Sequence, residues 1–324
     1  MRAETRSGRA RAAARAGWMA LGLAATLAWL ALDPLPAAAA ASCSVYATPG
    51  SHTLALALGG TQRLLLVHVP EGIRVGRRAA LVLALHGVGG SGPQMERYSG
   101  LSRVADQNRF IVAYPSADGA VWNSTGAQGQ PDDVAFLDRT ITVLDRSGCV
   151  DPRRVFAAGV SNGGQMVALA GCQLSSEIAA IAVVAGNYGA TAPCRPSRPL
   201  SVLDIHGTAD PIVPYLGGAP RRPADGLPPL VSGWVSGDGC SPSPVTFVLA
   251  PSTTAYRWGR CTGGVRVEHI RIHGGRHQWP GATPPDPGPP STICAACTIW
   301  SFFAGLDPNG RSWSLSGGAA LGGE

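Results

Sequence analysis

The chain has 324 residues, of which 45% are hydrophobic and 14% are charged, and its formal net charge is +6. This size and apolar content are enough for one large buried core, and the low charged fraction argues against a disordered chain. Every basic residue except histidine is an arginine, which excludes Schiff-base lysines, P-loop lysines and Ser-Lys dyads.

The first 41 residues have the layout of a secretory signal peptide. Five arginines precede an apolar run from Trp18 to Leu32, and small residues follow from Ala37 to Ala41. A membrane anchor is the alternative, but the run is shorter than the roughly 20 residues that span a bilayer. We therefore expect cleavage near Ala41 and a secreted protein, extracellular or periplasmic, without membrane attachment. Cleavage removes much of the positive surplus, so nucleic-acid binding is not expected.

All the cysteines follow the expected cleavage point: Cys43, Cys149, Cys172, Cys194, Cys240, Cys261, Cys294 and Cys297. Their even number in an exported chain indicates structural disulfides. The sequence does not fix their connectivity, although Cys240 and Cys261 flank a hairpin pattern, and Cys172 and Cys194 bracket a strand. The Cys294-x-x-Cys297 pair has no second pair at metal-ligand spacing, so no metal site is expected.

Beyond the leader, apolar runs of strand length alternate with helical patterns. The predicted strands are Thr53–Leu56, Gln62–Val69, Ala80–Leu85, Phe110–Tyr114, Ala179–Val184, Leu200–Ile205 and Val265–Ile272. The predicted helices are Tyr98–Asn108, Val134–Ser147 with a cap at Asp132-Asp133, and Cys297–Phe303, while Val155–Ala170 predicts a strand, a tight turn and a helix. The first two strands form a hairpin across Gly59-Gly60, and the later alternation implies an α/β fold with a mostly parallel central sheet flanked by helices.

Two Pro/Gly-rich stretches interrupt this alternation, Gly217–Leu230 and Pro280–Pro290. They shape a substrate groove or serve as ordinary surface connections, and the sequence favours neither. Residues 307–324 predict a flexible C-terminal tail.

A Gly-x-Ser-x-Gly sequence, Gly159 to Gly163, lies between a buried strand and an apolar helix. This spacing forces Ser161 onto a sharp bend that exposes its hydroxyl at the carboxyl edge of the sheet, with glycines where a Cβ would collide with the backbone. The next N–H, that of Asn162, then lies at the positive start of a helix, where it can hold an oxyanion. A structural Gly/Ser turn is the alternative, but such a turn would rarely have both flanking elements.

A serine nucleophile needs a base, and the base needs an orienting carboxylate, in the chain order Ser, Asp, His for this architecture. Asp210 follows the strand Leu200–Ile205 in a loop fixed by Pro211, whereas Asp204 lies inside that strand. His277 lies in the loop after the last strand, where the base is required. A turn-capping role for Asp210 and a plain surface position for His277 are the structural alternatives.

The second oxyanion donor is expected in the loop after the first buried strand, His86-Gly87-Val88-Gly89-Gly90, and we predict the N–H of Val88. A glycine turn needed only for tight packing is the alternative. Trp122 and Trp279 are predicted to line the substrate site, although tryptophans are more often packing residues.

Seven sequence blocks carry a resemblance to a known family: Leu-His-Gly (85–87), Trp-Asn (122–123), Asp-Asp-Val-Ala-Phe-Leu (132–137), Val-Asp-Pro-Arg-Arg-Val (150–155), Gly-Val-Ser-Asn-Gly-Gly (159–164), His-Gly-Thr-Ala-Asp (206–210) and Gly-Gly-Arg-His-Gln-Trp-Pro (274–280). Together they resemble the secreted polyhydroxybutyrate depolymerase / feruloyl esterase family, the branch of α/β-hydrolases that also contains acetyl xylan esterases. The similarity runs from about residue 50 to about residue 305.

The resemblance implies an α/β-hydrolase catalytic domain over residues 42–306, with the family's nucleophile, acid and base on Ser161, Asp210 and His277. Family members often have a glycine where Arg276 stands and a cysteine where Val88 stands. These departures concern the substrate pocket and leave every catalytic group in place.

The predicted function is a secreted serine carboxylesterase that forms an acyl-enzyme and needs no metal or organic cofactor. Feruloyl or acetyl esters of polysaccharide and polyhydroxyalkanoate-type polyesters remain open as substrates, and we expect a monomer. An exported serine peptidase is one alternative, disfavoured because no gating domain is present. A catalytically silent surface- or polymer-binding protein is the other, disfavoured by the complete triad.

Overall fold

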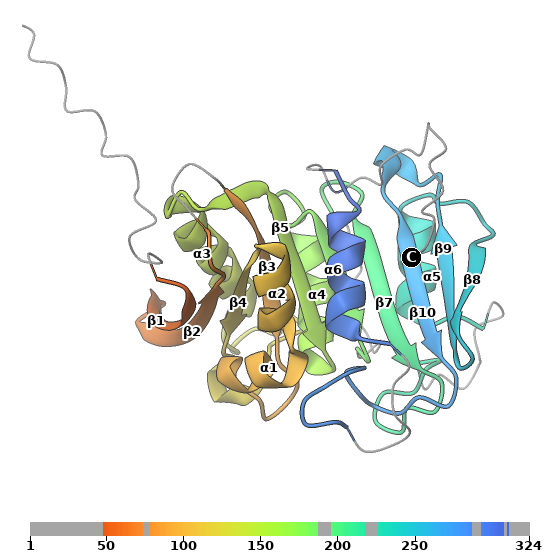
Figure 1. The fold of residues 1–324 in the computed structure, drawn as a ribbon, viewed down its shortest axis with the longest axis horizontal. Coiled ribbons are helices and arrows are strands. Elements are labelled where there is room, and N and C mark those ends of the chain that lie inside the picture. Colours follow the sequence, from red (N-terminus) through yellow and green to blue (C-terminus); the bar gives the residue numbers. More distant parts are fainter. Residues whose placement is uncertain are drawn as a thin grey trace, which may run out of the picture. The chain divides into compact units, whose positions relative to one another are not determined.

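One mixed β-sheet runs through the part of the chain that the computed structural model describes, which is residues 48–73, 78–186, 196–217, 226–286, 293–307 and 310. Its strands lie in the order β1-β2-β4-β3-β5-β6-β7-β10-β9-β8 (Figure 1). Their bounds are β1 (Gly50–Leu58), β2 (Thr61–Val69), β3 (Ala79–Leu85), β4 (Ile111–Pro115), β5 (Val150–Val160), β6 (Ala180–Val184), β7 (Ser201–Gly207), β8 (Val245–Ala250), β9 (Thr253–Trp258) and β10 (Val267–Ile272). The expected signal peptide and nearly all of the expected tail lie outside the described residues.

The strands at the centre of the sheet, β4, β3, β5, β6, β7 and β10, are parallel to one another. Antiparallel strands extend the sheet on both sides, β2 and β1 next to β4, and β9 and β8 next to β10. Every residue of β3 and of β6 is buried, as expected for parallel strands that are covered on both faces. The carboxyl ends of all the parallel strands therefore meet at one edge of the sheet.

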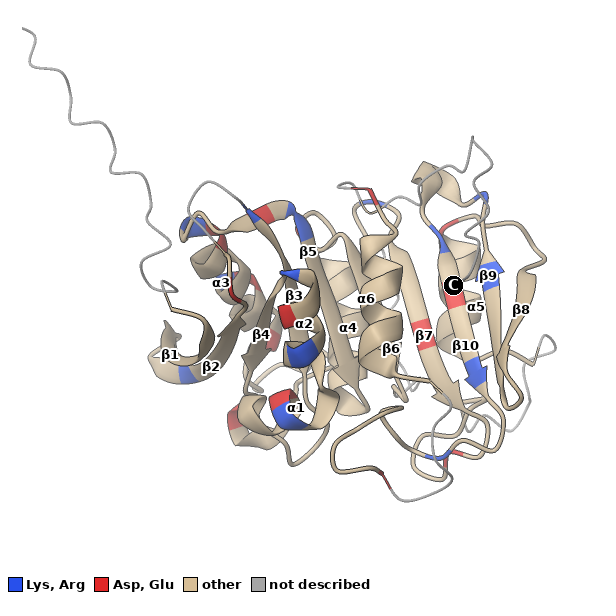
Figure 2. Cartoon of the chain, viewed as in Figure 1, with Lys and Arg blue, Asp and Glu red and all other residues tan. Residues whose placement is uncertain are grey.

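Two hydrophobic clusters cover the two faces of this sheet. Leu81 and Leu83 of β3 belong to one cluster and Val82 and Ala84 to the other, because alternate side chains of a strand point to opposite faces. The first cluster includes residues of α3 (Asp133–Arg146), α4 (Asn162–Gln173) and α5 (Pro229–Gly237). The second includes residues of α1 (Gly92–Ser99), α2 (Leu101–Asn108) and α6 (Ala295–Ala304), and Figure 1 shows α2 and α6 in front of the strands. Neither α4 nor α6 carries a charged residue (Figure 2), which fits helices packed over the apolar central strands.

Most predicted elements are confirmed, but the region before β4 differs from the prediction. The helix predicted over Tyr98–Asn108 is two helices, α1 and α2, which meet at Gly100 with a φ of 68°. A left-handed glycine ends a helix, because its backbone angle cannot continue the hydrogen-bond ladder. Helix α5 is not predicted from the sequence, because the Pro228-Pro229 pair indicates a loop. Proline is in fact favoured in the first turn of a helix, and α5 begins at Pro229. Two short 3-10 helices, η2 (Asp118–Ala120) and η3 (Thr262–Gly264), complete the described elements.

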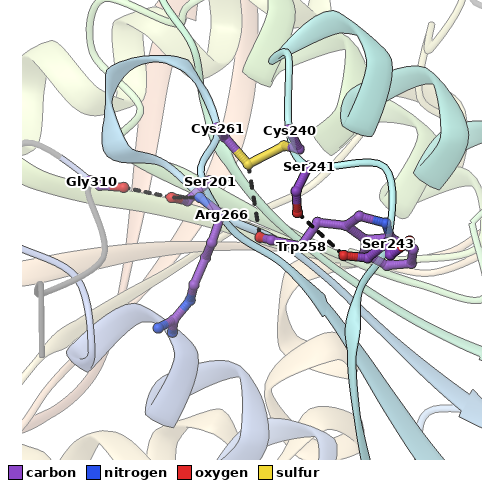
Figure 3. Close-up of a disulfide and its surroundings, with 8 residues drawn as sticks. All are labelled: Ser201, Cys240, Ser241, Ser243, Trp258, Cys261, Arg266 and Gly310. Atoms are coloured by element: carbon purple, nitrogen blue, oxygen red, sulfur yellow. Dashed lines mark hydrogen bonds between the residues drawn. A yellow bond between two sulfur atoms is a disulfide. The ribbon is translucent and has the colours of Figure 1, made fainter.

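Every cysteine among the described residues is in a disulfide bond. Cys240, which follows α5, is bonded to Cys261, which follows β9 (Figure 3), as the hairpin pattern between them suggested. Cys294 is bonded to Cys297 at the start of α6. Cys172 is also in a disulfide, but the predicted partner, Cys194, lies outside the described residues. No helix in the described ranges is both long and apolar enough to span a bilayer.

Candidate active site

Ser161 occupies the turn between β5 and α4, with a φ of 56° and a ψ of −122°. This backbone conformation is rare for a residue with a side chain and persists only where the surroundings enforce it. The Ser161 N–H donates to the carbonyl oxygen of Val184 on β6 at 2.9 Å. A Cβ on Gly159 would lie 2.4 Å from the carbonyl oxygen of Gly163, so the strand and the helix approach each other more closely than any other residue permits. The structure thus has the strand–turn–helix geometry that the sequence predicted around Ser161.

Asp210 lies three residues beyond the end of β7, and its side chain is inaccessible to solvent. Its Oδ1 accepts the backbone N–H groups of Ile212 and Val213, each at 2.8 Å. Burial alone would raise the pKa of Asp210, but hydrogen bonds from His206, His277 and these two amides outweigh it and hold the pKa far below its usual value. These hydrogen bonds favour the ionised form of Asp210.

His277 lies in the loop after β10 and is bonded to Asp210, with 2.8 Å between Nδ1 of the imidazole and Oδ2 of the carboxylate. Strands β7 and β10 are parallel neighbours, with Gly207 in register with Ile272, so the loops that follow them run side by side. The Ala209 N–H donates to the carbonyl oxygen of Gly275 at 2.9 Å and links the two loops directly. The structure therefore brings the predicted acid and base together, and it places Ser161 at the same edge of the sheet.

The loop after β3 lies against Ser161. A Cβ on Gly87 would be 3.4 Å from the Cβ of Ser161, which is van der Waals contact, so the two turns lie directly against each other. His86 fixes this loop, because its Nδ1 donates to the Gly87 carbonyl oxygen at 2.7 Å and its Nε2 accepts the Ala117 N–H at 3.0 Å. Burial lowers the pKa of His86, which agrees with a neutral imidazole in these two bonds.

The two predicted oxyanion donors, Asn162 and Val88, directly follow the two residues that meet here, Ser161 and Gly87. Asn162 is the first residue of α4, where backbone N–H groups have no partner within the helix. Its side chain is engaged elsewhere: Oδ1 accepts the Trp122 N–H at 2.8 Å, and Nδ2 donates to the hydroxyl of Ser124 at 3.0 Å. Val88 follows Gly87 and is 67% exposed.

Trp122 and Trp279, predicted to line the substrate site, are both buried, at 2% and 1% exposure. The indole N–H of Trp122 donates to the carbonyl oxygen of His86 at 2.9 Å, and that of Trp279 donates to the carbonyl oxygen of Ser99 at 3.1 Å. Neither ring can offer a face to a substrate, because protein atoms surround it. Each tryptophan instead supports a loop, Trp122 the loop after β3 that begins at His86, and Trp279 the loop that contains His277.

Asp286, Tyr98 and His206 also support the site, and the sequence analysis gives none of them a role there. Asp286 accepts the Trp279 N–H at 2.8 Å and the Tyr98 hydroxyl at 2.7 Å, which ties the base loop to α1. His206 lies next to Asp210, although its place before the acid in the chain excludes it as the base. The sequence pattern that could have predicted this contact is the spacing of His206 four residues before Asp210. Within the described ranges, no group of His, Cys, Asp and Glu side chains has a metal-binding arrangement.

Comparison with known proteins gives relatives that are esterases by name. No family model matches the chain. It is 33% identical over 230 residues to feruloyl esterase B of Piromyces equi, a match that covers 66% of this chain and 42% of that longer protein. It is 32% identical over 255 residues to the protein named “Putative esterase NocK” of Nocardia uniformis subsp. tsuyamanensis, covering 70% of this chain and 74% of that one.

Among solved structures, the acetyl xylan esterase from Aspergillus awamori superposes with a TM-score of 0.56 at 17% identity. The match covers 71% of this chain and 95% of that chain, and it shows a shared fold. The sheet order, the strand–turn–helix unit and these relatives agree: the chain belongs to the feruloyl esterase and acetyl xylan esterase family of α/β-hydrolases.

Proposed function

We propose that this protein is a serine carboxylesterase in which Ser161, His277 and Asp210 transfer the acyl group of an ester to water. The observation that carries the proposal is the 2.8 Å contact between His277 Nδ1 and Asp210 Oδ2, at the sheet edge where Ser161 occupies a strained strand-to-helix turn. A serine presented on such a turn and a histidine held by a buried carboxylate are the parts that acyl transfer requires.

In the first half of the reaction, the Ser161 hydroxyl attacks the ester carbonyl carbon while His277 Nε2 takes the hydroxyl proton. The carbonyl oxygen becomes negative and accepts hydrogen bonds from the N–H groups of Asn162 and Val88, the first of which also lies at the positive end of α4. Asp210 stabilises the imidazolium that forms. His277 then gives its proton to the alcohol oxygen, the ester bond breaks, and the acyl group remains on Ser161.

In the second half, a water molecule attacks the acyl-enzyme, and His277 takes one of its protons. The same two N–H groups hold the second oxyanion. Collapse of this intermediate breaks the bond to the Ser161 oxygen, which recovers its proton from His277, and the carboxylic acid leaves. The low pKa of Asp210 keeps its carboxylate charged through both halves.

Feruloyl or acetyl esters carried on polysaccharide are our proposed natural substrates, because relatives are named for feruloyl and acetyl xylan ester hydrolysis. Polyhydroxyalkanoate-type polyesters are the second candidate, from the sequence resemblance. Secretion after cleavage near Ala41 is proposed too, and the disulfides of the described residues indicate an oxidising compartment. We further propose that residues 42–306 act as a monomeric catalytic domain.

The test is hydrolysis of a matched panel, p-nitrophenyl acetate and butyrate, methyl ferulate, acetylated xylan and a hydroxybutyrate oligomer, by the unmodified protein and by Ser161→Ala. The expected result is that kcat on the preferred ester falls by about 10³-fold or more in Ser161→Ala. Ser241→Ala is the control, because the Ser241 hydroxyl donates to the Ser243 carbonyl oxygen of its own turn, near the Cys240–Cys261 bridge (Figure 3). Equal rates for Ser161→Ala and the unmodified protein would show that the serine turn is structural.

The same panel separates the alternatives. A silent polymer-binding protein predicts retained binding to xylan or polyester with no ester hydrolysis by the unmodified protein. An exported peptidase predicts a higher kcat/KM on a peptide p-nitroanilide than on any ester of the panel.

A further inference from the structure

A second histidine contacts the proposed catalytic acid. His206 is the next-to-last residue of β7, and its side chain is inaccessible to solvent. Its Nε2 lies 3.3 Å from Asp210 Oδ2 and 3.0 Å from the carbonyl oxygen of Val213. Both neighbouring atoms are acceptors, so Nε2 carries a hydrogen and donates it.

This contact completes the set of donors around the carboxylate. Oδ1 accepts two backbone N–H groups, from Ile212 and Val213. Oδ2 is bonded to His277 Nδ1 and lies 3.3 Å from His206 Nε2, whose one hydrogen is shared with the Val213 carbonyl oxygen. Rotation of the carboxylate would break bonds on both oxygens. His206 also closes the turn that carries Asp210, because its Nε2 reaches the Val213 carbonyl oxygen on the far side of that turn.

The His206 ring also packs against Tyr215, which lies further along the same loop as Asp210. The contact is edge-on, with 5.7 Å between ring centroids. The Tyr215 hydroxyl is bonded to His269 Nε2 at 2.6 Å and accepts from Arg271 Nε at 2.7 Å. The titratable and charged groups around His206 are thus Asp210, Tyr215, His269, Arg271 and, bonded to His269, Asp204.

We propose that His206 is a positioning residue of the catalytic acid, a second N–H donor that fixes Asp210 and shares its Oδ2 with His277. This inference rests on the proposed serine esterase function. Each hydrogen bond to a carboxylate stabilises its negative charge, so a carboxylate oxygen with two donors holds each proton less strongly than an oxygen with a single donor. His206 therefore limits how strongly Asp210 stabilises the protonated form of His277, and so sets the lowest pH at which His277 works as the base.

The experiment measures kcat, KM and the acidic limb of the kcat/KM profile with p-nitrophenyl acetate. His206→Phe keeps a ring against Tyr215 but removes the donor, and His206→Gln carries an amide N–H at the position of Nε2. In His206→Phe we expect kcat to fall between about ten-fold and about a hundred-fold with KM unchanged. The acidic limb should move to higher pH, because Asp210 then holds protonated His277 more strongly. His206→Gln should recover most of the kcat and return the limb toward its original position.

The matched control is His68→Phe. His68 lies on β2 and is another histidine that contacts an aspartate, with 2.8 Å between its Nε2 and Asp106 Oδ1. The acidic limb of His68→Phe should stay unchanged. The inference is overturned if His206→Phe keeps the original kcat and limb, if His206→Gln behaves like His206→Phe, or if His68→Phe shifts the limb equally. If His206→Phe fails to fold, His206→Asn removes the same donor with a smaller side chain.

Ser161→Ala in the same assay keeps the two proposals apart. Residual activity equal to that of the unmodified protein would remove the serine esterase function itself. Loss of activity in Ser161→Ala together with an unchanged His206→Phe would remove only the role of His206.

Discussion

Asp238 is a buried carboxyl group at the C-terminal end of α5, only 2% exposed. Its Oδ2 has no hydrogen-bond partner among the described residues. Burial raises the pKa of Asp238 to about 7, and a hydrogen bond with the backbone of Leu200 only partly opposes this. An ordinary aspartate in the unfolded chain has a pKa of about 3.9. The folded protein therefore holds a proton, between about pH 4 and about pH 7, that the unfolded chain has lost.

This difference makes the stability depend on pH. Because the folded state binds the extra proton, the free energy of unfolding falls as the pH rises through this window, by up to about 1.4 kcal/mol per pH unit. Above about pH 7 the folded carboxyl ionises as well, and the loss stops growing. Asp238→Asn cannot ionise, so we expect it to raise the melting temperature at pH 8 and to leave it nearly unchanged at pH 4.

Thermal unfolding of both proteins across that pH range measures the effect. Asp118→Asn is the control, since Asp118 is exposed in η2 and should leave the pH dependence intact. Parallel melting curves for Asp238→Asn and the unmodified protein at every pH would contradict the prediction.

The contact between α4 and the end of β3 determines how closely Ser161 approaches the loop after β3. Gly163, the second residue of α4, lies where a Cβ would be 2.3 Å from the carbonyl oxygen of His86 and 2.5 Å from that of Leu85. Backbone atoms on both sides cannot move aside as a flexible side chain would. The helix therefore packs at this distance only with a glycine in this position.

Gly163→Ala is expected to push α4 away from the loop that carries Val88. We predict a stability loss of about 3 kcal/mol or more and a lower kcat in any folded fraction. Gly233→Ala is the matched control in α5, because nothing lies within 4 Å of its added Cβ. That control should be neutral or stabilise by up to about 1 kcal/mol, through the higher helix propensity of alanine. Denaturant unfolding and ester hydrolysis measure both, and equal behaviour of the two variants would refute the packing argument.

At the scale of the whole molecule, the Cys240–Cys261 bridge lies at the edge of the sheet opposite the proposed active site. Cys261 follows β9, whose last residue is Trp258 (Figure 3). Trp258 is in register with Val267 at the beginning of β10. His277 follows the other end of β10. The bridge closes a loop with a sequence separation of 21, so it restricts the unfolded chain and contacts no catalytic group.

Replacing both cysteines by serine should lower the free energy of unfolding by about 3 kcal/mol and leave kcat/KM at 25 °C nearly unchanged. The corresponding replacement of Cys294 and Cys297 should have a smaller effect, because that loop has a separation of only 3. Differential scanning calorimetry with an activity assay tests this. A loss of kcat/KM at full folding would show that the Cys240–Cys261 bridge positions the catalytic loops.

The sequence by itself determined the features that local backbone chemistry specifies. Gly-x-Ser-x-Gly between an apolar strand and an apolar helix admits few conformations, so the turn at Ser161 was predictable from its own neighbours. The buried parallel strands were predictable from continuous apolar runs such as that of β3. Chain order, together with a position in a loop beyond a strand end, selected Asp210 and His277 as the candidates.

Only the tertiary structure decided which side chains meet across long sequence separations. The register of β7 with β10 places Asp210 against His277, 67 residues apart, and burial turns Trp122 and Trp279 from expected substrate contacts into supports for two loops. The same packing directs His206 at the acid. A sequence pattern specifies the period along one element, whereas these contacts depend on how separate elements are aligned in space. That alignment is set by the whole core.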